Sequence, residues 1–152
     1  MNEHFAFAKA VRKNIATLVS SLTIEQLNKI PDGCNNNIAW HLGHIVVSSE
    51  LLCYIRTEAK LNQEIPLQEK YRNGTRPENF IQQTEIDYLL SRLQPSLEAI
   101  EADYSKGIFQ TIKPYATHTF GIEMNTIEMV FQACSHHDVL HAGSIGIMRK
   151  FL

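Results

Sequence analysis

Apolar residues recur every three or four positions along nearly the whole chain, which is the spacing of amphipathic helices rather than strands. From this pattern we predict four long helices, over about residues 3–22, 37–58, 78–104 and 125–151. Thr23 and Gln26 have the spacing of a capping box, which predicts a short helical turn after the first helix. The asparagine run that ends at Asn37 offers an N-cap for the second long helix.

The apolar faces of these helices indicate how each one is buried. On the first helix, the inward face is predicted to hold Phe7, Val11, Ile15 or Leu18, and Leu22. The helix over 37–58 is apolar around most of its circumference, which is typical of a helix buried on all sides. The inward stripe of the last helix consists of Ile127, Val130, Cys134, His137, His141, Ile145 and Met148.

Two connections are too long for simple helical hairpins. Residues 60–79 are polar and contain two prolines and a glycine, and residues 107–121 contain a proline among β-prone residues. Pro95 lies inside the third helix and is expected to kink or split it. The fold class that follows is all-α, a four-helix bundle with long crossover connections that forms a single domain over residues 1–152.

The last helix carries the clearest candidate chemistry, because two histidines occupy its inward stripe. His137 and His141 are four residues apart, so their side chains lie on the same helical face. Two imidazoles in this arrangement can bind one metal ion, and imidazole suits zinc, nickel, copper and iron. The alternative is a pair of core histidines whose ring nitrogens are satisfied by hydrogen bonds.

A catalytic metal site usually has three protein ligands and an open position, and the second long helix offers a third ligand. His41 and His44 both lie there, and their spacing does not choose between them. Gly43, between the two, would let another part of the chain or a ligand approach the helix closely. No glutamate precedes a histidine by three residues, so the sequence lacks the pairs that hold di-iron centres and favours a mononuclear site.

The bulk composition excludes several other classes of function. A net charge of -2 and the lack of any basic block argue against nucleic-acid binding. Three scattered cysteines form neither a disulfide framework nor a CxxC zinc motif, which fits a reducing cytoplasm. The first residues lack the features of a signal peptide, and no apolar run is expected to approach the length of a membrane span.

Two elements of the sequence, taken together, resemble the DinB-like superfamily: Asn37-x-x-Trp40-x-x-x-His44-Ile45 and, far downstream, His137-x-x-x-His141-x-Gly143-x-Ile145. The resemblance extends over essentially the whole chain, including the helix order and the two long connections. Its members are bacterial four-helix bundles of the DinB/YfiT type that hold a divalent ion, nickel or zinc, with three histidines. The resemblance therefore implies that His44, His137 and His141 are metal ligands.

The resemblance also implies a class of reaction. Relatives include bacillithiol transferases and mycothiol-dependent maleylpyruvate isomerase, in which the metal is thought to activate a thiol. The expected function is thus a metal-dependent S-transferase, or a hydrolase, that acts on a small molecule and uses a low-molecular-weight thiol. The alternatives are a metal-binding bundle with a structural or sensory role that acts through dimerisation, since relatives are often homodimers, and a bundle that binds no metal.

Several further residues have candidate roles that neither spacing nor the resemblance decides. The candidates for a general base are Asp138, Glu50 and His41. The candidates for a cationic rim that receives the carboxylates of a thiol cofactor are Arg56, Arg72 and Arg76. Cys134 precedes His137 by one turn, and it or His41 would be a fourth ligand if the site were structural. No role follows for His118 and His136.

Overall fold

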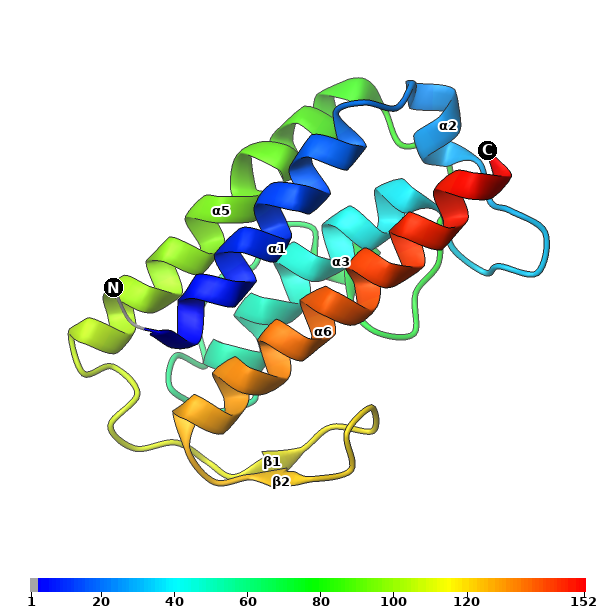
Figure 1. Ribbon diagram of the computed structural model, residues 1–152. Helices are drawn as coiled ribbons and strands as arrows, with labels where there is room; N and C mark the ends of the chain where they lie inside the picture. The colour runs from blue at the N-terminus through cyan, green and yellow to red at the C-terminus, as the bar shows by residue number, and fades with distance from the viewer. Residues whose placement is uncertain (1–2) are drawn as a thin grey trace.

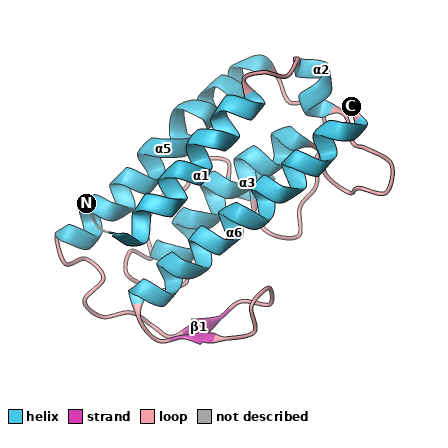
Figure 2. Cartoon of the chain, viewed as in Figure 1, coloured by secondary structure: helices cyan, strands magenta, loops and turns pink. Residues whose placement is uncertain are grey.

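The computed structural model describes residues 3–152, which are mostly helical (Figures 1 and 2), so the all-α prediction is confirmed. The four long helices are α1 (Glu3–Val19), α3 (Ile38–Glu50), α5 (Gln83–Ser105) and α6 (Ile127–Met148). The shorter elements are α2 (Ile24–Asn28), the π-helix η1 (Leu51–Ile55) that extends α3, α4 (Gln68–Tyr71), the antiparallel pair β1 (Tyr115–Ala116) and β2 (Glu123–Met124), and the 3-10 helix η2 (Arg149–Phe151).

The four long helices lie side by side, and α1 and α3 each contact both α5 and α6. Figure 1 shows that α1 and α6 run in one direction while α3 and α5 run in the other. Because α3 and α5 are parallel, the chain must return along the molecule between them. This return explains the length of the connection over residues 56–82, which the sequence already indicated.

Side-chain caps begin three of the described helices, each at a position where the sequence offers a capping residue. The Thr23 hydroxyl and the Gln26 side chain form the expected capping box on α2. Asn37 caps α3, because its side-chain oxygen accepts a hydrogen bond from the backbone N–H of Trp40 at 2.8 Å. At α6 the cap is Thr126, whose hydroxyl accepts from the N–H of Met129.

The inward face of α1 agrees with the prediction only in part: Ile15 is buried and Val11, Leu18 and Leu22 pack against the core, but Phe7 does not. Phe7 is 78% exposed, whereas the buried residues of this helix are Phe5, Ala8, Arg12, Ile15 and Val19. This stripe has the spacing of a helical face, but Arg12 interrupts it with a charge. The stripe of α6 agrees with the prediction, with Cys134 and Ile145 buried and both histidines partly buried.

The third long helix also differs from the sequence prediction. It begins at Gln83 rather than near residue 78, because the N–H of Ile81 donates to the side-chain oxygen of Asn28 and holds the preceding chain outside the helix. It continues through Pro95 as one helix and is not split. The polar connection before it contains α4, which the sequence pattern did not reveal.

The stretch Ile38–Ile55 is long and apolar enough to cross a membrane, which corrects the expectation that no run approaches that length. In this structure 83% of the stretch is buried inside the molecule. Every residue of α3 is buried, as the apolar circumference of the helix predicted. This environment is that of a core helix surrounded by other helices.

A polar layer crosses the apolar core. Along α1, α5 and α6, the buried polar residues Arg12, Ser96 and Asp138 each stand between members of two separate apolar clusters. The Arg12 guanidinium donates to Asp138 Oδ2 at 2.7 Å, to the carbonyl of Leu93 at 2.9 Å and to Ser96 Oγ at 3.1 Å. A longer bond of 3.4 Å reaches the carbonyl of Ile45 on α3, so one side chain joins all four long helices.

Candidate metal centre

Three histidine side chains converge between α3 and α6. His137 Nε2 lies 3.2 Å from His44 Nε2 and 3.1 Å from His141 Nε2. Within the described residues, these three side chains form a group whose donor atoms all lie within 4.8 Å of one another. The sequence pattern anticipated this group, because the i, i+4 pair of the last helix meets a histidine of the second long helix.

The connection after α3 orients His44. His44 Nδ1 lies 2.6 Å from the backbone carbonyl oxygen of Tyr71, so Nδ1 carries the proton and donates it. Nε2 therefore offers a lone pair, and it lies 3.2 Å from both the Ser48 hydroxyl and His137 Nε2. The His44 ring stacks on Trp40 with a centroid separation of 4.5 Å. Trp40 is fixed in turn, because its indole N–H donates to Thr75 Oγ1 at 3.0 Å. Residues 71–75 therefore set both the tautomer and the plane of the His44 ring.

Tyr71 packs directly on α3, and Gly43 is the residue that makes room for it. A Cβ atom at position 43 would lie 2.4 Å from Cδ1 of the Tyr71 ring. The expectation that Gly43 admits a close approach is thus confirmed, and the approaching group is a ring from α4. The Tyr71 hydroxyl also donates to Glu85, which ties α4 to α5.

Replacement of Gly43 with alanine is expected to destabilise the protein by about 1 to 3 kcal/mol, because the new methyl group overlaps the buried Tyr71 ring. Urea unfolding measures this loss. Gly143→Ala on α6 is the matched control, since a Cβ there meets no atom within 4 Å and should add about 0.5 to 1 kcal/mol of stability. Equal effects of the two substitutions would contradict the packing described for Tyr71.

His41 contacts His141 at the ring nitrogen that does not face His137. The Nδ1 atoms of these two rings are 2.7 Å apart, whereas Nε2 of His141 faces His137. His41 is buried and makes an edge contact with Trp40. It is therefore next to the group of three histidines without being one of its members.

The two Nε2 separations that involve His137 fit a single ion, and all donor atoms of the group lie within 4.8 Å of one another. Two imidazole nitrogens bound at tetrahedral angles to one zinc ion lie about 3.3 to 3.4 Å apart. The observed separations of 3.1 and 3.2 Å are close to this value. Neither His41 nor Cys134 belongs to the group, so the side chains that the structure describes contribute three donors here and not the four of a closed structural site.

A family model described as the DinB superfamily matches residues 8–145, which include all three histidines. The chain belongs to the DinB superfamily. No curated protein matches it. The resemblance inferred from the two histidine elements is therefore confirmed at the level of the superfamily, which is a metal-binding one.

All four histidines of this DinB superfamily site have depressed pKa values, and burial is the main cause. Burial and the neighbouring His44 lower the pKa of His41 to about 4. Burial and the surrounding histidines lower the pKa of His137 to about 3 and that of His141 to about 2. Burial also lowers the pKa of His44, although its hydrogen bond to the Tyr71 carbonyl opposes this. The rings are thus neutral at pH 7, which is the form that binds metal.

These shifts predict that the metal-free protein loses stability as the pH falls below about 6.5. In that range the unfolded chain takes up protons on histidines that stay neutral in the fold, which costs up to about 1.4 kcal/mol per pH unit for each histidine. Urea unfolding at pH 7 and pH 5 in a chelator measures the effect. His141→Asn should show a shallower pH dependence, and an unchanged dependence would contradict burial of a neutral ring at position 141.

The two carboxylates considered as general bases are both engaged inside the core. Asp138 pairs with Arg12, and Glu50 accepts from Arg92 at 2.6 Å. Burial raises the pKa of each carboxyl group, and the paired arginine opposes this. Of the three base candidates, His41 is therefore the one that contacts a histidine of the group.

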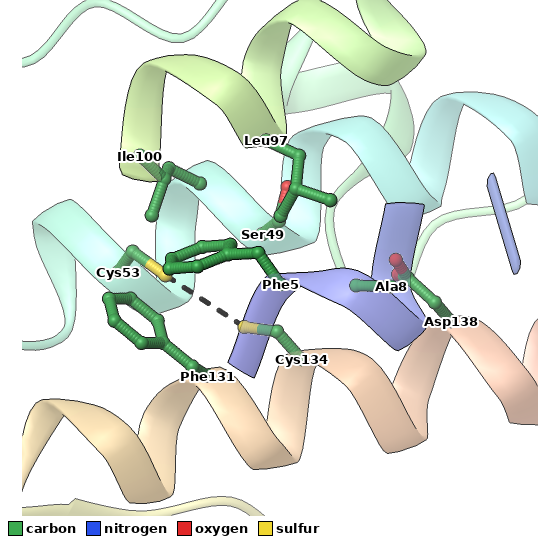
Figure 3. A pocket seen from close by; sticks show the side chains of 9 residues that line it. All are labelled: Phe5, Ala8, Ser49, Cys53, Leu97, Ile100, Phe131, Cys134 and Asp138. Carbon is green, nitrogen blue, oxygen red and sulfur yellow. Dashed lines mark hydrogen bonds between the residues drawn. The ribbon is translucent and has the colours of Figure 1, made fainter. Parts of the chain in front are cut away.

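Cys134 lies away from the histidines, beside another cysteine. Figure 3 shows it in a small pocket with Cys53, and the two sulfur atoms are 3.9 Å apart. Both thiols are free and buried among apolar side chains, and the contact with Cys134, together with burial, raises the pKa of Cys53. Cys134 is thus part of the apolar packing and is not a fourth ligand.

The arginines proposed as a cationic rim have different surroundings. Arg56 lies over the Tyr115 ring and donates to the carbonyl of Ala116 in the β-hairpin, and Arg72 forms an exposed ion pair with Glu69. Arg76 is exposed and directly follows Thr75, the hydrogen-bond partner of Trp40. His118 and His136 are also exposed and do not belong to the histidine group.

Proposed function

We propose that this chain binds one divalent ion, nickel or zinc, through Nε2 of His44, His137 and His141, and that it is a metal-dependent transferase or hydrolase of small molecules. The observation that carries the proposal is the convergence of three histidines whose donor atoms lie within 4.8 Å of one another, with His137 Nε2 3.2 Å from His44 Nε2 and 3.1 Å from His141 Nε2. Membership of the metal-binding DinB superfamily supports it. In this proposal α1, α3, α5 and α6 form a four-helix bundle whose core holds the site.

The bound metal would supply a Lewis acid that makes a thiol or a water molecule more acidic. The chain's own part is to hold three neutral imidazoles in fixed orientation, since Tyr71 and His41 each contact the Nδ1 atom of one histidine. Three donors instead of four leave room for a substrate at the ion, which favours catalysis over a structural role. The proposed substrates are a low-molecular-weight thiol and a small electrophile.

An assay of thiol transfer tests the enzymatic part of the proposal. The protein loaded with zinc or nickel is incubated with bacillithiol, glutathione or cysteine and 1-chloro-2,4-dinitrobenzene, which yields a thioether, chloride and a proton. Hydrolysis of p-nitrophenyl acetate is followed in parallel. Turnover that requires the metal and is lost in His44→Ala supports the proposal. Equal rates for the loaded protein and for His44→Ala would contradict it.

A second candidate function is that of a non-enzymatic metal-binding bundle that acts as a homodimer. The observation that favours it is an exposed apolar face on α6, formed by Val139, Leu140 and Ile147 around Gly143, whose Cα is open to solvent. Sedimentation of the protein and of Leu140→Lys tests this. A dimer that dissociates in the variant supports the candidate, and a monomer at all concentrations excludes it.

A further inference from the structure

His141 has a partner on each of its ring nitrogens, and the two partners differ. Nε2 faces His137 within the proposed metal site, and Nδ1 faces Nδ1 of His41 at 2.7 Å. His41 belongs to α3, one turn before His44, and its ring is outside the group of three. The contact joins α3 and α6 beside the ligands.

The proton positions in this contact follow from simple valence. In a contact between two ring nitrogens, one must carry a proton and the other must offer a lone pair. A metal bound at Nε2 of His141 requires the lone pair there, so the proton of His141 stays on Nδ1. His141 is then the donor, His41 Nδ1 is the acceptor, and the proton of His41 is on its Nε2.

We propose that His41 is a positioning residue of the metal centre, one that accepts the Nδ1–H hydrogen bond of His141 and thereby fixes the ring and tautomer of that ligand. This inference rests on the proposed metal site. His44 is oriented in the corresponding way, since its Nδ1 donates to the carbonyl of Tyr71. Two of the three proposed ligands thus have a dedicated acceptor, a main-chain oxygen for His44 and an imidazole for His141.

The surroundings of His41 hold it in place for this role. The residue is only 9% exposed, and its ring meets the Trp40 ring edge-on with an interplanar angle of 82°. Trp40 is fixed by its hydrogen bond to Thr75. Because the same Trp40 ring stacks on His44, one aromatic side chain contacts both a proposed ligand and the proposed acceptor of another.

The test compares two substitutions of equal size. Asparagine keeps an acceptor oxygen near the position of Nδ1, whereas leucine has the same shape without an acceptor. Loss of a hydrogen-bonded partner of a metal ligand typically weakens affinity by about 10- to 100-fold. We therefore expect His41→Leu to bind zinc about 10- to 100-fold more weakly than the unmodified protein, and His41→Asn to stay within about threefold of it. Zinc affinity is measured by competition with a chromophoric chelator.

His44→Ala serves as the reference and separates this inference from the proposed function. If the unmodified protein binds no zinc, both the proposed function and the role of His41 are wrong. If it binds zinc and His44→Ala does not, but His41→Leu binds as tightly as the unmodified protein, the role of His41 alone is wrong. A loss in both His41 variants as large as in His44→Ala would also overturn the positioning role.

A second test uses the unmodified protein, so its result does not depend on whether a variant folds. Long-range proton–nitrogen NMR spectra of the zinc-loaded protein distinguish the two tautomers of each histidine. We expect the proton on Nδ1 of His141 and on Nε2 of His41. A proton on Nδ1 of His41 in the zinc-loaded protein would contradict the inference.

Discussion

His137→Ala is expected to weaken zinc binding by between a hundredfold and a thousandfold. His137 is the central member of the group, since its Nε2 lies within 3.2 Å of the corresponding atoms of both other histidines. Structural zinc sites with four ligands bind with about 10 to 16 kcal/mol, which is about 2.5 to 4 kcal/mol for each ligand. Each 1.4 kcal/mol corresponds to about a factor of ten in affinity.

His136→Ala is the matched control for this experiment. His136 is the preceding residue of α6, but it is exposed and its ring lies near Phe120 rather than near His44. Competition with a chromophoric chelator should give the same zinc affinity for this variant and for the unmodified protein. If the two alanine variants bind zinc equally well, His137 is not a ligand and the assignment of the site is wrong.

Arg12→Met is expected to destabilise the protein by about 3 to 5 kcal/mol, which is the usual effect of removing one partner from a buried ion pair. The substitution leaves the Asp138 carboxylate buried without its cation, and the Leu93 carbonyl and Ser96 lose a donor. Since domains of this kind are stable by about 5 to 15 kcal/mol, such a loss is a large fraction of the total. Urea unfolding at pH 7 measures it.

Two further variants show whether the loss comes from the buried charge. Arg72→Met removes the arginine of an exposed pair with Glu69 and should leave stability unchanged. Arg12→Met combined with Asp138→Leu removes both buried charges and should recover part of the loss. If Arg12→Met is as stable as Arg72→Met, the polar layer does not hold the four helices together.

Arg12 also lies next to the proposed metal site, because two of its hydrogen-bond partners are neighbours of the ligands in the sequence. Asp138 follows His137 in α6, and Ile45 follows His44 in α3. Arg12 donates hydrogen bonds to the Asp138 side chain and to the Ile45 carbonyl, so it links α6 and α3 next to their proposed ligands. The same ion pair occupies Asp138, one of the three candidates for a general base.

The apolar periodicity predicted the long helices, and the spacing of the histidines predicted that they share a helical face. Both are local properties of the sequence, so both could be read without the fold. The i, i+4 spacing of His137 and His141 is a property of one helix, and the strongly apolar neighbours of His44 point it inward. The spacing did not choose between His41 and His44; the resemblance to the superfamily pointed to His44, and the fold places His44 in the group of three. The two lie close around the same helix, and both are buried beside the site.

The features that the sequence did not predict all depend on contacts between distant segments. α4 has four residues in a polar connection, too few to show a period, yet the Tyr71 carbonyl orients His44. On α1 the apolar pattern through Phe7 and Val11 hid the position of Arg12 on the buried face. Arg12 can be buried there because it forms hydrogen bonds with groups on three other helices. Similarly, the start of α5 was misplaced because the partner of Ile81 is Asn28, in another helix.

Elemental analysis by plasma mass spectrometry tests the central claim most directly. The purified, untagged protein is compared with the double variant His137→Ala/His141→Ala after both are exposed to zinc or nickel and then dialysed. The convergence of the three Nε2 atoms predicts about one divalent ion per chain in the unmodified protein and none in the variant. No bound metal in the unmodified protein, or equal amounts in both, would show that the three histidines are packing residues of the core.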